Sequence, residues 1–455
     1  MRKIWLHGAQ NSRGEVVDLY IAEGRLLSKE QAFDLGFWTQ DKALAEDVSV
    51  IEANGKLLLP GLIDAHVHLR DPGQTQKEDI KSGTRAAARG GVTSVLCMPN
   101  TRPVIDDVTV LRYVMDKAKR EALVNVFPIA AATKGQQGEL LTDMGKLKEA
   151  GAVAVSDDGV PVATAAMMQR TMSYASDFDL PVIDHCEEMT LAEGGVMNEG
   201  ETSAKLGVQG IPSIAEDIIV ARDILLAEYL DCPVHLAHIS TARSVQLIRE
   251  AKARGVKVTA ETCPHYWVLT DEACDAYNTL ARVNPPLRQK EDQEAIVAGL
   301  QDGTLDLIVT DHAPHHVSDK EVPFEEAKNG MIGLETAWAL VYTYLVKTGK
   351  LTLEQVEKAF CRRPAEIFHL QRGTLAEGEV ADLILVDLEE TWTIDRFKMA
   401  SSSNNSPYHQ CSVQSRVHLT MVAGDIVYLR SEDEAFLAGQ AASLQGSQKA
   451  YRLEL

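Results

Sequence analysis

The chain has 455 residues, 45% of them hydrophobic and 24% charged, and a formal net charge of −21. These values are typical of a globular protein large enough for one barrel and an accessory domain, and the acidic balance disfavours binding to nucleic acid or anionic lipid. Seven cysteines without a C-x-x-C pair, no apolar signal segment and no long apolar run predict a cytoplasmic protein with reduced thiols.

The order of apolar segments along the chain predicts the fold class. Residues 1–56 have the pattern of short strands separated by turns, as in residues 17–24. From Leu57 onward, short apolar runs alternate with longer helical patterns, which is typical of βαβ units. Eight strands are expected, the number that a closed (β/α)8 barrel requires. They cover residues 59–65, 92–98, 124–130, 152–156, 181–184, 234–237, 256–260 and 305–310.

Helical patterns fill the segments between these strands, for example at residues 78–90, 142–149, 213–230, 242–254 and 291–300. The alternation ends near Gly373, and residues 381–387 and 417–428 again have strand patterns. The sequence therefore predicts an α/β protein with a (β/α)8 TIM barrel at residues 57–372. A small β-sandwich domain would combine residues 1–56 and 373–430, and residues 431–455 would form a tail that frays or packs as a helix.

Two histidines stand at the end of the first barrel strand. His66 and His68 are two residues apart, so both side chains leave the strand on the same face and can converge on one metal ion. The same pair is also compatible with one core histidine and one surface histidine. The two interpretations are about equally supported by this motif alone.

Further candidate ligands follow other predicted strands. In a barrel of this type the active site lies at the carboxyl ends of the strands. The residues found there are Asp157, Asp158, His185, His238 and Asp311. Taken singly, each histidine could belong to the core and Asp311 could cap a helix, but five of eight strand ends carrying imidazole or carboxylate predict a metal site.

The number and type of ligands predict two metal ions. Four histidines and two aspartates exceed the three or four ligands of one catalytic zinc, and they suit two ions that share a carboxylate. Nitrogen and oxygen ligands fit Zn²⁺, with manganese or cobalt as substitutes. Two dications, two aspartates and a bridging hydroxide leave a charge of +1, which favours an anionic substrate.

Several longer motifs resemble those of dihydroorotases, which are metal-dependent amidohydrolases. They lie at residues 60–75, 97–103, 284–288, 310–315 and 333–336, and the similarity spans nearly the whole chain. The resemblance implies reversible cyclisation of N-carbamoyl-L-aspartate to (S)-dihydroorotate, a step of de novo pyrimidine (UMP) biosynthesis.

The resemblance also implies roles for the candidate ligands. His66, His68 and Asp311 would hold one Zn²⁺, and His185 and His238 the second. Many relatives bridge the ions with a carboxylated lysine, whereas this chain has Asp157 and Asp158 at that place, as in the bacterial aspartate-bridged (class I) type. Asp158 is the expected bridge, together with a hydroxide, because it directly precedes the Gly-x-Pro turn.

The substrate contacts expected from the resemblance lie close to these ligands. Arg70 follows the metal histidines, and its guanidinium can bind a carboxylate through two hydrogen bonds. The remaining contacts implied are His68, Asn100, Asn284, His315 and the backbone of Asn329 and Gly330. Without the resemblance, Asn100 could serve a turn and His315 could cap a loop. Relatives often have Pro-Phe-Gly where this chain has Lys-Asn-Gly at residues 328–330.

In the mechanism that the resemblance implies, the bridging hydroxide attacks the ring carbonyl and Asp311 carries its proton to the leaving nitrogen. Hydantoinase, dihydropyrimidinase and allantoinase are alternatives, and Arg70 discriminates against them because their substrates lack the ring carboxylate. An inactive scaffold protein is a further alternative, but such proteins usually lose ligands that this chain retains. A binding module that uses the barrel mouth has no positive support in the sequence. We also expect a homodimer, and association with aspartate transcarbamoylase, as in some relatives, stays open.

Overall fold

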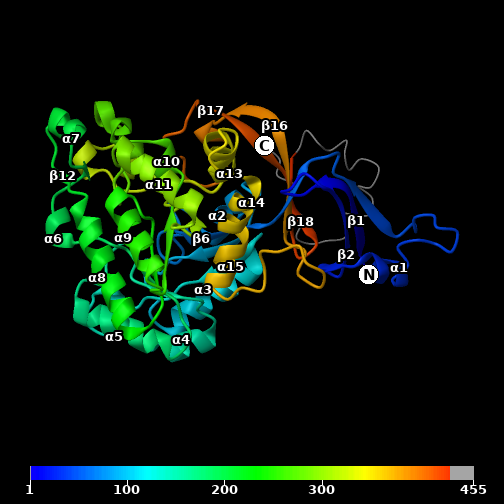
Figure 1. Ribbon diagram of the computed structural model, residues 1–455, viewed down its shortest axis with the longest axis horizontal. Coiled ribbons are helices and arrows are strands. Elements are labelled where there is room, and N and C mark those ends of the chain that lie inside the picture. The colour runs from blue at the N-terminus through cyan, green and yellow to red at the C-terminus, as the bar shows by residue number, and fades with distance from the viewer. Residues whose placement is uncertain (1, 431–455) are drawn as a thin grey trace.

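The computed structural model describes residues 2–430 and contains a barrel beside a β-sheet domain (Figure 1). Barrel strands β6, β7 and β8 form one parallel ladder, and β9, β10, β13, β14 and β15 form another. Parallel bridges from Ala130 to Val155 and from Val67 to His312 join the two ladders into a closed ring. The strands cover Leu62–Val67, Val92–Cys97, Asn125–Pro128, Val155–Ser156, Val182–Asp184, Val234–Leu236, Val258–Thr262 and Leu307–Ile308.

Helices surround this ring and bury their inner faces against it (Figure 1). Side chains of Asp79, Asp107, Thr164 and Thr241 accept hydrogen bonds from the first turns of α2, α3, α5 and α9, which explains where these helices begin. The main barrel helices are α2 (Ile80–Arg89), α3 (Val108–Glu121), α4 (Met144–Ala150), α5 (Ala165–Ser176), α8 (Ile214–Leu230), α9 (Ala242–Ala253) and α11 (Lys290–Asp302). Shorter helices are α6 (Met189–Ala192), α7 (Glu201–Leu206), α10 (His265–Val268), α12 (Val317–Lys320), α13 (Ala337–Val341), α14 (Leu353–Glu357) and α15 (Arg363–Ile367).

The β domain is one connected sheet built from both ends of the described chain. Its order is β18-β17-β16-β5-β1-β2-β3, and β4 pairs with β1. Apolar side chains such as Leu6, Leu58, Leu385 and Leu419 form a core of its own. The strands of this sheet are β1 (Lys3–Gln10), β2 (Val16–Ala22), β3 (Arg25–Leu27), β4 (Val48–Glu52), β5 (Leu57–Pro60), β16 (Leu383–Thr393), β17 (Ser412–Val422) and β18 (Asp425–Leu429). Helix α1 (Lys29–Asp34) follows β3. Two short strands, β11 (Met197–Asn198) and β12 (Gly210–Ile211), pair with each other apart from this sheet.

The chain passes from the sheet into the barrel at Gly61. The apolar run that begins at Leu57 divides here, because β5 pairs with β1 and β16 whereas β6 belongs to the barrel. A Cβ atom on Gly61 would lie 2.0 Å from the Thr93 Oγ1 atom, so only glycine fits at this crossing. The strand that leads to His66 therefore starts at Leu62.

The predicted fold class is confirmed, and each of the eight expected barrel strands has an observed counterpart. Helices α3 and α5 were not among the predicted helices. The division into domains at residues 56 and 372 stays a prediction, and the predicted tail at 431–455 lies outside the described residues. Within residues 2–430, no helix combines the length and apolarity needed to cross a bilayer.

Candidate metal centre and active site

The six predicted ligands lie together at the carboxyl ends of the barrel strands. His66 belongs to β6 and His68 follows it, whereas the other ligands follow β9, β10, β13 and β15 within three residues. All six are almost completely buried. The ligands on these other strands are Asp158, His185, His238 and Asp311.

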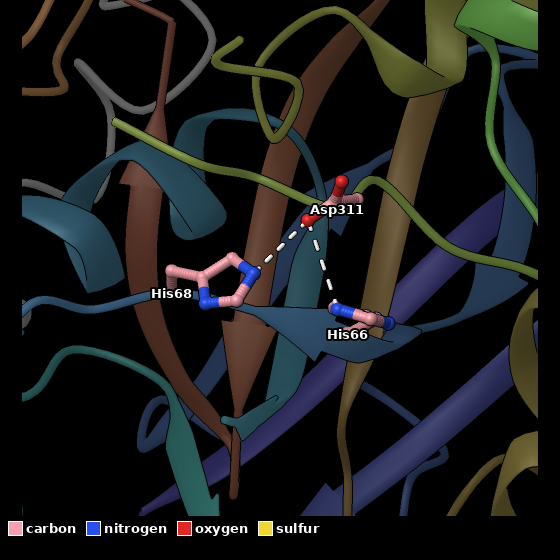
Figure 2. Close-up of side chains that lie close together, drawn as sticks. All are labelled: His66, His68 and Asp311. Atoms are coloured by element: carbon pink, nitrogen blue, oxygen red, sulfur yellow. Dashed lines mark hydrogen bonds and ion pairs between the residues drawn. The ribbon is translucent and has the colours of Figure 1, made fainter. Parts of the chain in front are cut away.

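Three of the ligands converge from β6 and from the segment after β15 (Figure 2). The His68 Nε2 atom lies 3.0 Å from the Asp311 Oδ1 atom, and the His66 Nε2 atom lies 3.7 Å from the same oxygen. One atom from each of the three residues can therefore face a single cation.

The two oxygens of Asp158 face different ligands. Its Oδ2 atom lies 3.5 Å from His68 Nε2. Its Oδ1 atom lies 3.4 Å from His66 Nε2, 3.3 Å from His238 Nε2 and 3.7 Å from His185 Nδ1. A carboxylate between two groups of imidazoles in this way has the arrangement that a bridge between two cations requires.

Asp157 points elsewhere. Its carboxylate accepts a hydrogen bond from the Thr133 backbone N–H at 3.0 Å and another from the Thr133 hydroxyl. The structure thus brings Asp158, and not Asp157, into contact with the histidines. The role of Asp158 as a bridge between metal ions stays a prediction.

The donor set fits a metal centre. Within the described part of the chain, His66 Nε2 and Asp158 Oδ1 are buried and make no hydrogen bond, a costly arrangement that a cation between them would relieve. Burial opposes charge on Asp158, but the positive charge of His66 and the neighbouring imidazoles of His185 and His238 hold the pKa of Asp158 well below its usual range. Burial likewise opposes ionisation of Asp311, and the hydrogen bond from His68 and the charge of His66 outweigh it and lower the pKa of Asp311 to about 2. Both carboxylates are therefore ionised and attract positive charge.

Residues behind the ligands fix their orientation. His66 Nδ1 lies 2.6 Å from Glu261 Oε1, and the other carboxylate oxygen of Glu261 lies 3.1 Å from His235 Nε2. His68 Nδ1 lies 2.9 Å from the Asn100 Oδ1 atom. The Nε2 atom of each histidine is therefore left to face the other candidate ligands. Residues that hold the second nitrogen of a metal-binding histidine in this way fix its orientation and tune metal affinity. Sequence reasoning missed Glu261 and His235, although Glu261 directly follows the predicted strand at residues 256–260, as the candidate ligands follow theirs.

His185 and His238 approach from β10 and β13. The His185 Nδ1 and His238 Nε2 atoms lie 2.9 Å apart, close enough to share one cation. The other ring nitrogen of His185 lies 3.3 Å from the Glu187 Oε2 atom and from the Asn284 Nδ2 atom. Asn284 therefore contacts a predicted ligand, while its own Oδ1 atom is buried without a hydrogen-bond partner in residues 2–430.

Arg70 is buried beside the ligands, and its charge is not neutralised by a contacting carboxylate. Its Nε atom donates to the Pro314 carbonyl at 3.2 Å, and its Nη2 atom lies 3.4 Å from His315 Nε2. Burial lowers the pKa of Arg70 to about 10, so the guanidinium stays charged at neutral pH. Residues 2–430 contain no ion pair of Arg70. A buried guanidinium without a contacting carboxylate has the charge and the donors to bind an anion.

Asn329 and Gly330, two further predicted substrate contacts, make hydrogen bonds within the protein. The Asn329 Oδ1 atom accepts from Arg282 Nε at 2.8 Å, and the Asn329 carbonyl lies 2.8 Å from His315 Nε2. The Gly330 N–H donates to the Arg282 carbonyl at 2.9 Å. These backbone groups are thus already hydrogen-bonded within the protein, so a ring contact would have to share or replace these bonds.

Asn405, which sequence reasoning also missed, holds the loop between Asp311 and Gly330 through hydrogen bonds. It lies near the C-terminal end of the described chain. Its side chain donates to the carbonyls of Ala313 and Gly330 at 3.0 and 3.1 Å and accepts from the His315 N–H at 3.0 Å. The loop between Asp311 and Gly330 is therefore fixed by a residue of the segment that joins β16 and β17. No local pattern around Asn405 indicates this contact.

Comparison with known proteins supports the interpretation of the site. A family model described as dihydro-orotase-like matches residues 55–244. The dihydroorotase of Acetivibrio thermocellus is 56% identical over 83% of this chain and 89% of its own length. That of Pelobacter propionicus is 48% identical over 91% of this chain and 100% of its own length. The chain belongs to the dihydroorotase family.

A solved structure confirms the fold of this dihydroorotase family member. The L-hydantoinase (dihydropyrimidinase) from Arthrobacter aurescens superposes with a TM-score of 0.83 at 24% identity, over 94% of this chain and 96% of its own. The predicted family and the predicted enzyme class, a cyclic amidohydrolase, are both confirmed. The His and Asp groups described above are the candidate metal-binding residues of this dihydroorotase-family chain.

Proposed function

We propose that the protein is a zinc-dependent dihydroorotase that interconverts N-carbamoyl-L-aspartate and (S)-dihydroorotate in pyrimidine (UMP) biosynthesis. The observation that carries this proposal is the buried guanidinium of Arg70, which lies beside the metal ligands without a carboxylate partner in residues 2–430. Dihydroorotate has a carboxylate on its ring, whereas hydantoin and dihydrouracil have none. A buried cation in the pocket of a cyclic amidohydrolase therefore favours the carboxylated substrate.

The ligand geometry supports a pair of Zn²⁺ ions. His66, His68 and Asp311 would hold one ion, His185 and His238 the other, and Asp158 would contact both. Imidazole and carboxylate ligands without sulfur suit zinc. When bound, such ions supply a water of lowered pKa and polarise the amide carbonyl.

Asp311 is the proposed general base and acid. Its low pKa keeps the carboxylate ionised at neutral pH, so it can accept the proton of the attacking water. The same low proton affinity lets Asp311 release that proton to the leaving ring nitrogen. In the direction of synthesis, Asp311 takes the proton from the carbamoyl nitrogen as the ring closes.

The residues around Arg70 provide the proposed substrate contacts. Arg70 and His315 would bind the ring carboxylate, since their nitrogens lie on the same side of the pocket, 3.4 Å apart. Asn100 and His68, which lie 2.9 Å apart, would contact the same carboxylate. The unpartnered Oδ1 atom of Asn284 would accept a hydrogen bond from the ring N–H. Asn329 and Gly330 would contact the ring only through backbone groups.

The test is substitution of Arg70 by Met. We expect kcat/KM for dihydroorotate to fall by about a hundredfold or more, because a buried charged contact is lost. Zinc content, measured by elemental analysis, should stay unchanged, and hydrolysis of dihydrouracil should not fall. Unchanged dihydroorotate turnover in this variant would exclude the proposed substrate.

The outer face of α8 supports the proposed homodimer. Ile214, Ile218, Ala221, Leu225 and Tyr229 recur at helical spacing along that face, and all but Ala221 are exposed, with Tyr229 at 77%. An exposed apolar stripe of this kind is normally covered by another protein surface. The helix that carries this stripe spans 17 residues, or about 25 Å, a length suited to antiparallel contact with α8 of a second copy.

Two further expectations belong to the same proposal. The seven cysteines all lie within residues 2–430 and none forms a disulfide, which supports a reducing, cytoplasmic location. We also propose association with aspartate transcarbamoylase, as the resemblance to relatives implies.

A further inference from the structure

Each ring nitrogen of His315 has two contacts. One of them requires an N–H on that nitrogen, and the other requires a lone pair. His315 Nδ1 lies 3.2 Å from the Lys77 Nζ atom and 3.4 Å from the Asp319 Oδ2 atom. His315 Nε2 lies 2.8 Å from the Asn329 carbonyl oxygen and 3.4 Å from the Arg70 Nη2 atom. Each nitrogen thus faces one group that only donates and one that only accepts.

Two of these four contacts suit one tautomer of the His315 ring, and the other two suit the second tautomer. If Nε2 carries the proton, His315 donates to Asn329 and accepts from Lys77, which uses the two shorter contacts. If Nδ1 carries the proton, His315 donates to Asp319 and accepts from Arg70, which uses the two longer contacts of 3.4 Å. The geometry therefore favours the tautomer with the proton on Nε2.

We propose that Lys77 is a positioning residue that holds neutral His315 in the tautomer whose Nε2–H donates to the substrate carboxylate. The proposal rests on the function proposed above, in which Arg70 and His315 bind that carboxylate. Lys77 has three donors and no acceptor, so its contact requires a lone pair on Nδ1. The proton is thereby placed on the side of the ring that faces Arg70. A substrate carboxylate is a stronger acceptor than the Asn329 carbonyl and can take over this N–H.

The charges around His315 support a neutral ring. Burial, followed by the charges of Arg70, Lys77 and Lys320, lowers the pKa of His315 to about 2, and only the hydrogen bond to Asp319 opposes this. Lys77 is itself mostly buried, with 14% of its side chain exposed, and lies 3.1 Å from Asp319. An ammonium held in this way stays close to Nδ1, because Asp319 fixes it from the other side.

Lys77 acts from the side of the His315 ring that faces away from Arg70. It contacts the far nitrogen of His315, and its backbone carbonyl accepts a hydrogen bond from the Ser403 hydroxyl. Its effect on substrate binding would therefore pass through His315. This distinguishes Lys77 from Arg70, whose guanidinium is the proposed direct contact.

The experiment compares the wild-type enzyme with Lys77→Met and Lys77→Arg, all loaded with zinc. The ring nitrogens of the 13 histidines are labelled with ¹⁵N, and the His315 signals are assigned by their loss in His315→Gln. We expect the Nε2–H tautomer in the wild type and in Lys77→Arg, since arginine also only donates. In Lys77→Met we expect the Nδ1–H tautomer, with the proton shared with Asp319.

Kinetics provide the second measurement. In Lys77→Met, KM for dihydroorotate should rise about tenfold or more while kcat stays within about twofold, because a binding contact is lost without a change at the metal ligands. Lys77→Arg should recover most of this loss. Lys252→Met is a matched control, since Lys252 is also mostly buried and paired with an aspartate, Asp306, that keeps Arg363 as a second partner.

Three results would overturn the proposal: a Lys77→Met enzyme that retains the Nε2–H tautomer, a parallel loss of kcat and zinc in that variant, or an Nδ1–H tautomer in Lys77→Arg. The tautomer spectra need no substrate. If the wild-type enzyme fails to hydrolyse dihydroorotate, the proposed function is wrong, whereas the spectra still decide what Lys77 does to His315.

Discussion

Substitution of Glu261 by Gln tests whether the residues behind the ligands control metal affinity. Glu261 is fully buried, and its carboxylate contacts His66 Nδ1 at 2.6 Å and His235 Nε2 at 3.1 Å. Burial opposes ionisation of Glu261, but the charges of His66 and His235 and their hydrogen bonds keep its pKa well below the usual value. An ionised Glu261 therefore holds the His66 N–H and makes Nε2 a better donor to a metal.

The expected magnitude follows from this contact. A hydrogen bond to a charged group contributes about 1.5–3 kcal/mol, and each 1.4 kcal/mol corresponds to a tenfold change in an equilibrium constant. The neutral amide retains the shape but loses the charge, so we expect zinc affinity to weaken about tenfold to a hundredfold, as is usual for such outer residues. Activity at saturating zinc should recover to within about tenfold of the wild-type value.

The assay measures activity and bound zinc while free zinc is set by a chelator buffer. Glu357→Gln is the control, because Glu357 is also buried and hydrogen-bonded but contacts Ser12 and Arg362 instead of a ligand. Equal zinc affinity in wild type and Glu261→Gln, or activity that excess zinc does not restore, would refute this account of Glu261.

Three further predictions concern separate parts of the molecule. Asp158→Asn should lose most bound zinc in elemental analysis, whereas Asp157→Asn, at the residue that faces Thr133, should retain it. Burial lowers the pKa of Lys320 to about 7, so the folded state binds fewer protons than the unfolded state above that pH. Thermal stability should therefore rise from about pH 7 towards pH 10 in the wild type, and this rise should disappear from melting curves of Lys320→Met. Leu225→Glu should convert a dimer into a monomer in light scattering without loss of zinc; a wild-type monomer would contradict the proposed α8 contact.

The gathering of the candidate metal ligands could be predicted because each follows a short apolar run. His66, His185 and Asp311 are polar residues at the ends of strands, and the barrel fold brings strand ends together. The pattern is local, so the sequence alone contains it. The same argument could not separate Asp157 from Asp158, since the choice depends on which neighbour turns towards Thr133.

Other residues of the site could not be predicted from local patterns. Asn405 and Lys77 lie far apart in the sequence and meet His315 only through the folded chain. Glu261 lies on β14, and its role depends on His66 from β6, which is separated from β14 by β15. The division of the apolar run at Gly61 depends on the close approach of Thr93. In each case the decisive information is a long-range contact.

Three residues of the candidate site have a strained backbone, among several such residues along the chain. Arg70, His238 and Asp311 have φ values of 59°, 31° and 47°, a region that residues with side chains rarely adopt, and each costs about 1–2 kcal/mol. All three stand where the chain leaves a barrel strand. Hydrogen bonds hold the turns: Gln74 N–H to the Arg70 carbonyl, Ile239 N–H to the Glu261 carbonyl and Ala313 N–H to the Met331 carbonyl. Because glycine would adopt these turns without strain but carries no ligand, the cost is explained by the need for a functional side chain at each turn.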